Sequence, residues 1–381
     1  MLTAPGPFVV CLDTAHWVGL IAALRSAKTR AGTQVRLAAF EAVGGSLALT
    51  FHHIVELAQH ENRDEVEARF RALGYIAPMC ALSGITSDGP GSVLDLIAQE
   101  LLAALESPDA EAEAIAAAVW PGAVEPASGA DFSDWLLPQL DILHWHAAKG
   151  TARSRNVSLL SQAAALDRSK EKLMPNARAL PTAEVKANLF ALGKRLAAEV
   201  VQRRDPRASE SEAVDGAAQF IRELMGDVEG IADHGNVWEA LLARANVSAQ
   251  EAAGMRYISE VADLGHFRKQ LEIPARHLGL TNDELRRVRP EQFPTWLIHL
   301  AYTKHRQVAA RTQGSDLGDM HLLCHAPYMD ALFVDKRTHE NVRRIRQKDP
   351  RTAVFLQSVQ RAGSWDAALD LARTAAASVS G

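Results

Sequence analysis

The chain has 381 residues, with 41 Lys and Arg against 46 Asp and Glu, so its formal net charge is −5. This length predicts two or three domains, or one domain with a large insertion. Its three widely spaced cysteines exclude a disulfide framework and a zinc knuckle, and the lack of a signal peptide or a long apolar span predicts a protein of the reducing cytoplasm.

The first 82 residues alternate between strand and helix signals. The run "PFVVCLD" (7–13) is apolar and β-branched, as in a strand buried on both faces of a parallel sheet. Residues 47–50 and 75–82 predict two more strands, and residues 51–60 and 63–74 predict helices. This order predicts a parallel α/β unit.

The pattern changes after residue 92. The following segments have a helical period and are rich in Ala, Leu and Glu, and none of them predicts a strand. About 220 residues are therefore expected to form an all-helical insertion in the α/β domain. The clearest helical segments are 93–106, 134–148, 183–204, 213–227 and 293–311.

Strand signals return near the carboxy end. Residues 331–335 and 352–356 predict strands, with a helix over 338–347 between them. The predicted organisation is an α/β domain in two parts, residues 1–90 and 311–381, interrupted by a helical insertion over residues 91–310.

Carboxylates are expected to converge at one edge of this sheet. Asp13 and Asp335 end the first and fourth strands, and parallel strands end at the same edge, where active sites of open α/β folds lie. Asp316 and Asp319 open the helix that leads into the fourth strand, so they start at that edge too. Glu56 follows the second strand and can point toward the first. Asp330 begins the fourth strand, which places it at the opposite edge.

Such a group of carboxylates predicts a metal site. Close carboxylates repel one another unless a cation is present, and oxygen ligands suit Mg²⁺ or Mn²⁺. Such a site can activate water for phosphodiester cleavage. The alternative is that each of these residues acts separately, as a helix cap, a turn residue or a surface residue.

A basic run follows Asp335. Residues 336–361 contain eight basic and two acidic side chains, and a local basic face can bind phosphates on an acidic protein. Lys336, Arg337, Arg343 and Arg344 are the predicted nucleic-acid contacts. A solvated helix face is the alternative.

Two pairs of histidines could suggest a different metal. His321 and His325 are spaced i, i+4, but no Glu stands between them as in the zinc motif of metalloproteases. They are predicted to point away from the aspartates of their helix and to serve the core or a cap. His52 and His53 are adjacent and cannot share a helix face.

Taken together, these motifs resemble the PIN domain. The resemblance lies in a strand ending in Asp, a helix preceded by Thr50 that contains Glu56-Leu57, and the segment "SDLGDMHLLCHAPYMDALFVDKR" (315–337), which looks like the PIN-like proteins of bacteria. It covers residues 7–82 and about 311–360. The family usually has Thr or Ser, one residue, and then Asp after the fourth strand, whereas "FVDKR" has no hydroxyl here.

The resemblance implies a three-layer α/β/α fold and a metal-dependent ribonuclease that acts on single-stranded RNA, as a toxin or a phage-defence effector. Two alternatives stay open: a degenerate, non-enzymatic scaffold that binds a partner protein through the helical insertion, and a structure-specific DNA nuclease. The resemblance places Asp13, Glu56, Asp319 and Asp335 in the acidic quartet that binds Mg²⁺ or Mn²⁺, with Asp316 as an auxiliary ligand.

Overall fold

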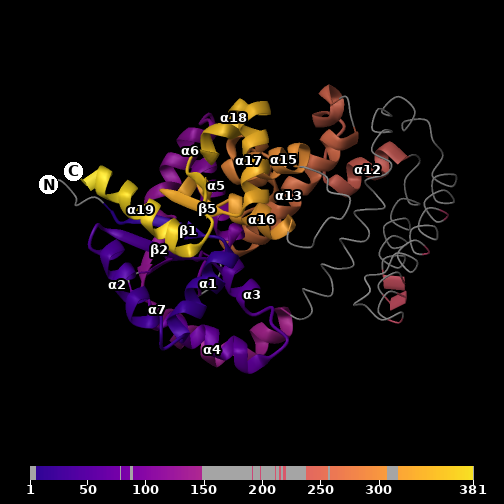
Figure 1. Cartoon of the computed structure of the whole chain (residues 1–381). Helices are drawn as coiled ribbons and strands as arrows, with labels where there is room; N and C mark the ends of the chain where they lie inside the picture. Colours follow the sequence, from indigo (N-terminus) through magenta and orange to yellow (C-terminus); the bar gives the residue numbers. More distant parts are fainter. Residues whose placement is uncertain are drawn as a thin grey trace. The chain divides into compact units, whose positions relative to one another are not determined.

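The computed structural model describes residues 6–77, 79–85, 89–147, 237–255, 258–306 and 316–380, and a few isolated helical residues between 191 and 219. The chain divides into two compact units (Figure 1). The first unit comprises Met1–Lys149, Ile273–Gln307 and Ser315–Gly381, and the second comprises Gly150–Glu272 and Val308–Gly314.

The first unit is an α/β domain built on one six-stranded sheet with the strand order β4-β3-β2-β1-β5-β6. All neighbouring strands pair in parallel except β3 and β4, which are antiparallel. The strands are β1 (Phe8–Leu12), β2 (Gly45–Leu49), β3 (Met79–Leu82), β4 (Val124–Ala127), β5 (Ala331–Val334) and β6 (Val359–Arg361).

The central strands are the apolar runs of the sequence. β1 and β5 pair in parallel with Val10 opposite Ala331, and β1 pairs on its other side with β2. Every residue of β2, β3 and β5 is buried, as their unbroken hydrophobic sequences predict. The predicted strands over 7–13, 47–50 and 331–335 are therefore confirmed to within two residues, whereas the strand predicted over 75–82 begins only at Met79.

The expectation of a purely parallel sheet, with no strand in the middle of the chain, was wrong. β4 adds an antiparallel strand to the edge of the sheet beside β3, with Pro126 opposite Cys80. Pro126 has no N–H to donate, which an edge strand tolerates because one side of the strand has no ladder. The sequence "VEPA" is short and half polar, so its strand depends on pairing with β3 rather than on its own propensity.

The predicted strand over 352–356 was also wrong. These residues form the short helix α18 (Pro350–Ala353) and a 3₁₀ turn, and the strand β6 comes three residues later. Asp349 caps the helix by accepting a hydrogen bond from the Thr352 backbone N–H at 3.2 Å, and Pro350 occupies the first helical position. Both are strong signals for a helix start, and they outweigh the β-branched and aromatic residues that follow.

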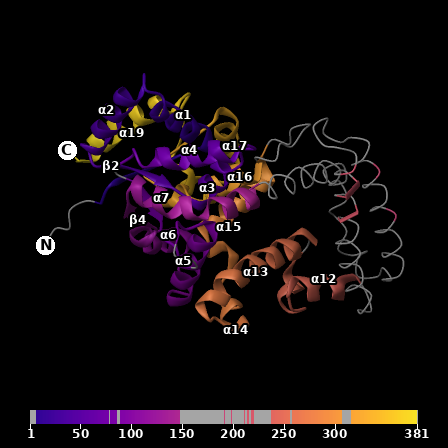
Figure 2. The ribbon, with the colours of Figure 1, turned by 90° about the horizontal axis from the view of Figure 1, so that it is seen from below.

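Helices lie on both faces of the sheet. On one face a continuous apolar core joins Val10, Leu12 and Phe333 of the strands to Trp17 and Phe70 of the helices. The C-terminal helix α19 packs against α1 and α2 on this face (Figure 2). The helices of this layer are α1 (Thr14–Arg25), α2 (Arg30–Glu41), α3 (Phe51–Leu57), α4 (Arg63–Leu73), α7 (Gly129–Leu136) and α19 (Trp365–Ser380).

The other layer is a group of mutually packed helices in which α15 contacts α5, α6, α16, α17 and α18. A buried carboxylate, Glu100, joins three parts of this layer. It accepts hydrogen bonds from the Thr295 backbone N–H at 3.1 Å, the Thr295 hydroxyl at 2.6 Å and the Tyr328 hydroxyl at 2.6 Å. The helices are α5 (Val93–Glu106), α6 (Ala112–Val119), α15 (Pro294–His305), α16 (Asp316–Leu323), α17 (Lys336–Lys348) and α18.

The compact unit that holds the sheet is larger than the predicted two-part domain. Residues 91–149 and 273–307, which the sequence analysis placed in the insertion, belong to the same unit as the sheet. Most of the rest of the predicted insertion lies outside the described residues, including the expected helices over 183–204 and 213–227, apart from isolated positions.

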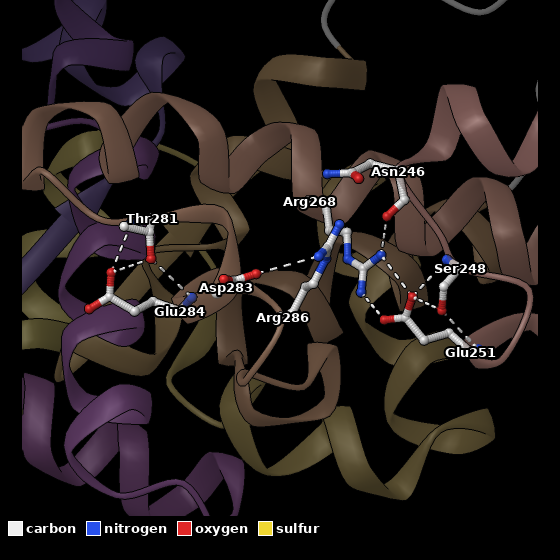
Figure 3. Close-up of polar contacts among 8 residues, drawn as sticks. All are labelled: Asn246, Ser248, Glu251, Arg268, Thr281, Asp283, Glu284 and Arg286. Atoms are coloured by element: carbon white, nitrogen blue, oxygen red, sulfur yellow. Dashed lines mark hydrogen bonds and ion pairs between the residues drawn. The ribbon is translucent and has the colours of Figure 1, made fainter.

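In the second unit, a buried arginine organises the described residues. The Arg268 side chain is 7% exposed, pairs with Glu251 and donates to the carbonyl oxygen of Asn246 (Figure 3). Asn246 has a left-handed backbone (φ 52°) directly after α12 (Val237–Ala245), and Arg268 belongs to α13 (Ile258–Leu278). Arg268 therefore ties the end of one helix to the middle of the other.

In the first unit, Thr281 and Glu284 form a capping box at the start of α14 (Asn282–Leu285), where Asp283 also pairs with Arg286 (Figure 3). Cys11, Cys80 and Cys324 are all buried and free, as their spacing predicts. Across the described ranges, no helix combines the length and the apolar character that crossing a membrane requires.

Candidate functional site

Asp13 and Asp335 hold equivalent positions at the carboxyl ends of two adjacent strands. Each directly follows its strand and caps the next helix. The Asp13 carboxylate accepts a hydrogen bond from the His16 backbone N–H at 2.9 Å, and the Asp335 carboxylate accepts one from the Thr338 backbone N–H at 2.7 Å. The two carboxylates thus stand on one edge of the sheet, as predicted, and both also have the capping role that the sequence left open.

Asp13 has a basic side chain, His16, beside it. The His16 ring nitrogen Nδ1 lies 2.7 Å from Asp13 Oδ1, and Nε2 lies 3.3 Å from the carbonyl oxygen of Ala362. Because a carbonyl oxygen only accepts, Nε2 is the ring nitrogen that carries a proton. Burial lowers the pKa of His16, but the hydrogen bond and charge of Asp13, with help from Asp335, outweigh burial and raise it.

Glu56 reaches the same edge from α3. Its carboxylate accepts a hydrogen bond from the hydroxyl of Thr14, the residue after Asp13. Gly318 of α16 makes room for it, because a Cβ at that glycine would lie 2.6 Å from Glu56 Oε1 and 2.9 Å from His52 Cε1. Burial raises the pKa of Glu56 and the charge of Asp13 raises it further, while the bond from Thr14 lowers it.

Asp319 completes the quartet on α16. Its Oδ2 lies 2.6 Å from Nη2 of Arg337, which belongs to the first turn of α17. Burial raises the pKa of Asp319 to about 6, although Arg337 lowers it, and the charge of Asp335 acts in the same direction as burial. A predicted metal ligand and a predicted phosphate contact are therefore paired with each other.

These electrostatic effects link the quartet into one group. Asp13 acts on Glu56, Asp335 acts on Asp319, and both Asp13 and Asp335 act on His16. Each effect joins one pair of groups, so the four carboxylates from four segments form a chain of pairwise interactions at one edge. The backbone of Asp316 begins α16 as expected, but its side chain lies outside the described residues.

The donor set has the chemistry of a Mg²⁺ or Mn²⁺ site, and the space at Gly318 is kept open for the Glu56 carboxylate. Within the described part of the chain, no three His, Cys, Asp or Glu side chains stand close enough in this conformation to hold a metal ion together. Three of the four carboxylates lie close to a basic side chain instead: Asp13 to His16 at 2.7 Å, Glu56 to His52 at 3.4 Å and Asp319 to Arg337 at 2.6 Å.

The basic run follows α17 away from the edge. Lys336 is exposed and Arg337 is partly exposed in its first turn, beside Asp335. Arg343 and Arg344 both pair with Glu340 of the same helix, at 2.7 and 3.5 Å. Their charges are thus partly offset locally. Further along, Arg346 donates to the carbonyl oxygens of Leu356 and Val359 and so holds the turn that precedes β6.

Asp330 lies at the other edge of the sheet, as strand polarity predicts. Its Oδ2 accepts a hydrogen bond from the Val9 backbone N–H at 2.7 Å, at the start of β1. It lines a cavity of about 1010 Å³ together with Phe8, Glu41, Met79 and other residues from the amino-terminal ends of the strands.

A cluster of four histidines lies between α3 and α16, and the sequence did not predict it. The rings of His52 and His321 lie edge to face with centroids 6.1 Å apart, and His53 and His325 are fully buried beside them. Burial lowers the pKa of His52 to about 4, of His321 to about 4 and of His325 to about 3, so the cluster is neutral at pH 7. The core role predicted for His325 is confirmed.

His53 also explains how α3 begins. Its Nδ1 accepts a hydrogen bond from the Thr50 backbone N–H at 3.1 Å, in the place that a Glu takes in an ordinary capping box. The cluster therefore packs α3 against α16 and brings Glu56 near Gly318. The spacing of each histidine pair was visible in the sequence, but their meeting depends on the contact between the two helices.

Comparison with protein-family models, with curated proteins and with solved structures gave no match for this chain.

Proposed function

We propose that this chain is a divalent-cation-dependent endonuclease that cleaves phosphodiester bonds in single-stranded RNA. The observation that carries the proposal is the gathering of Asp13, Glu56, Asp319 and Asp335 at the carboxyl-terminal edge of a largely parallel sheet. Ligand sites of open α/β folds lie at this edge. The resemblance of the flanking motifs to PIN-like proteins supports RNA as the substrate and a role as a toxin or a phage-defence effector.

Each residue has a role that its position supports. The carboxylates of Asp13, Glu56, Asp319 and Asp335 would hold Mg²⁺ or Mn²⁺. When bound, the cation would supply positive charge and lower the pKa of a water molecule. Thr14 holds one oxygen of Glu56, and the backbone of α17 holds Asp335, so these two carboxylates start in fixed orientations. Lys336, at the exposed start of α17, is placed to attract the phosphate backbone.

A second candidate function is a non-enzymatic scaffold. The ion pair between Asp319 and Arg337 favours it, because a degenerate site would retain its carboxylates by pairing them with cations of the chain. Partner binding would use the helical insertion over residues 91–310, of which residues 150–236 lie outside the described part apart from isolated positions.

The test is incubation of the purified full chain with labelled single-stranded RNA and with DNA of the same sequence, in Mn²⁺, Mg²⁺ or EDTA. Cleavage of RNA that EDTA abolishes is the expected result. Cleavage of DNA alone would replace the substrate with DNA, and no cleavage in any condition would favour the scaffold.

A further inference from the structure

Arg337 and Asp319 contact each other, although each would be needed by a different ligand of the proposed site. Asp319 would bind the divalent cation, and Arg337 would bind a substrate phosphate. Arg337 Nη2 lies 2.6 Å from Asp319 Oδ2. Both groups reach solvent, since the Arg337 side chain is 38% exposed and the Asp319 side chain 20% exposed. A cation bound through Asp319 would need the carboxylate that the guanidinium contacts.

His16 and Arg337, the basic side chains that contact Asp13 and Asp319, differ in geometry. His16 is buried and is contacted on both ring nitrogens, by Asp13 and by the carbonyl of Ala362, so its imidazole has no alternative position in which both contacts survive. Arg337 lies on a long side chain in the first turn of a helix, at the surface. An arginine guanidinium matches the geometry of both a carboxylate and a phosphate, so Arg337 can bind either.

We infer that Arg337 is an exchangeable counter-cation of the acidic edge: it holds Asp319 while no divalent cation is bound, and it turns to a substrate phosphate once a cation takes Asp319. The inference rests on the proposed function. It adds a coupling between two ligands, because each one stabilises the conformation in which Arg337 has left Asp319. Binding of the cation then tightens binding of the nucleic acid, and by linkage the nucleic acid tightens binding of the cation.

The neighbouring Lys336 provides a matched control. It carries the same charge one residue earlier and is exposed, and among the described residues the structure records no ion pair for it. Replacing either residue with alanine removes one positive charge from the start of α17. Only the Arg337 variant also removes the contact with Asp319.

The experiment measures Mn²⁺ affinity by titration calorimetry of the full chain, without nucleic acid, for wild type, Arg337→Ala, Lys336→Ala and Asp319→Asn. Arg337→Ala is expected to bind Mn²⁺ more tightly than wild type by on the order of fivefold or more, the usual size of such a coupling. Lys336→Ala should change the affinity much less, and Asp319→Asn should weaken it. A second titration uses a fluorescein-labelled phosphorothioate RNA with and without Mn²⁺, and here Mn²⁺ should tighten binding to wild type but not to Arg337→Ala.

The outcomes separate the two proposals. Equal changes for Arg337→Ala and Lys336→Ala, or weaker Mn²⁺ binding by Arg337→Ala, would overturn the exchange and leave the cation site standing. No Mn²⁺ binding by any of the four proteins would overturn both the exchange and the proposed nuclease. Mn²⁺ binding by Arg337→Ala but not by wild type would support the exchange in its strongest form.

Discussion

Asp13 and Asp335 end adjacent parallel strands one residue out of register: Leu12 of β1 lies opposite Phe333 of β5, and each aspartate directly follows the last residue of its strand. Each carboxylate accepts a hydrogen bond from the backbone N–H three residues later, at His16 and at Thr338. The same local rule thus builds both halves of the acidic edge. A cap fixes each side chain at the point where its strand ends, so the two carboxylates are held on one side of the sheet.

The first prediction concerns the ligands of the proposed metal site. Asp13→Asn and Asp319→Asn should each lower cation-dependent cleavage by on the order of a hundredfold or more, the usual effect of removing one electrostatic stabiliser. Asn caps helices about as well as Asp, so Asp13→Asn should stay folded. Cleavage assays with labelled RNA, together with circular dichroism, check both statements.

Asp330→Asn is the control for this prediction. It removes a carboxylate at the opposite edge, and the amide oxygen can still accept the Val9 N–H. Its cleavage rate should stay close to that of wild type. A loss as large as that of Asp319→Asn, in a folded protein, would mean that the polarity of the sheet does not define the site.

The second prediction uses the glycine that makes room for Glu56. Gly318→Ala would place a Cβ 2.6 Å from Glu56 Oε1, so the carboxylate or α16 must move. Cleavage should fall, although alanine favours a helix by about 1 kcal/mol over glycine. Gly32→Ala in α2 is the matched control, because its Cβ would meet nothing within 4 Å. It should raise the melting temperature and leave cleavage unchanged. Equal rates for the two variants would show that the position of Glu56 is unimportant.

The third prediction separates the two ends of the basic helix. In an inactive Asp13→Asn background, Lys336→Ala should flatten the dependence of log affinity on log salt by about 0.7 for each phosphate of a single strand that the protein no longer neutralises. Arg343→Ala and Arg344→Ala should change the slope less, since both residues pair with Glu340. Fluorescence anisotropy across a salt series measures the slope. If Arg343→Ala changed the slope more than Lys336→Ala, the phosphates would bind further along α17 than proposed.

The fourth prediction concerns stability and pH. Burial raises the pKa of Glu100 to about 7 from an ordinary 4.5, against hydrogen bonds from Thr295 and Tyr328 that lower it. Between these two values the unfolded chain has lost the proton that the folded protein retains, so the free energy of unfolding falls as the pH rises from 4.5 to 7. The free energy of unfolding of Glu100→Gln minus that of wild type should therefore be more positive at pH 8 than at pH 5.

Chemical denaturation at several pH values tests this relationship. Glu113→Gln, which replaces an exposed carboxyl group of α6, serves as the control and should follow the wild-type curve. The outcome that contradicts the prediction is a constant difference in the free energy of unfolding between wild type and Glu100→Gln from pH 4.5 to 8. It would mean that the buried carboxylate is ionised in the folded protein throughout this range.

Much of the sheet could be predicted because its central strands are buried on both faces. Residues such as Val10 and Phe333 belong to short apolar runs rich in β-branched and aromatic residues, which are typical of fully buried strands. The two short edge strands, β4 and β6, lack that signal because they contain Pro126, Gln360 and Arg361. Their pairing is a tertiary effect.

The candidate site, like the sheet, could be predicted only in part. The positions of Asp13, Asp335 and Glu56 follow from strand polarity, which is readable from element order. The partner of Asp13 was within reach too, since His16 lies three residues along the same helix start. The contact between Arg337 and Asp319 joins two elements separated by a turn and a strand, and no periodicity encodes it.

The order of strands in the chain has a consequence for synthesis. β1 is made long before its partner β5, since the hydrogen bond between Val9 and Asp330 joins residues 321 positions apart. A ribosome adds about 5 to 20 residues per second, so one whole side of an apolar central strand waits tens of seconds for its partner. Unpaired apolar strand edges recruit other chains. A nascent or truncated chain that stops before residue 331 should therefore aggregate through β1, whereas pairing with β5 covers this edge of β1 in the folded chain.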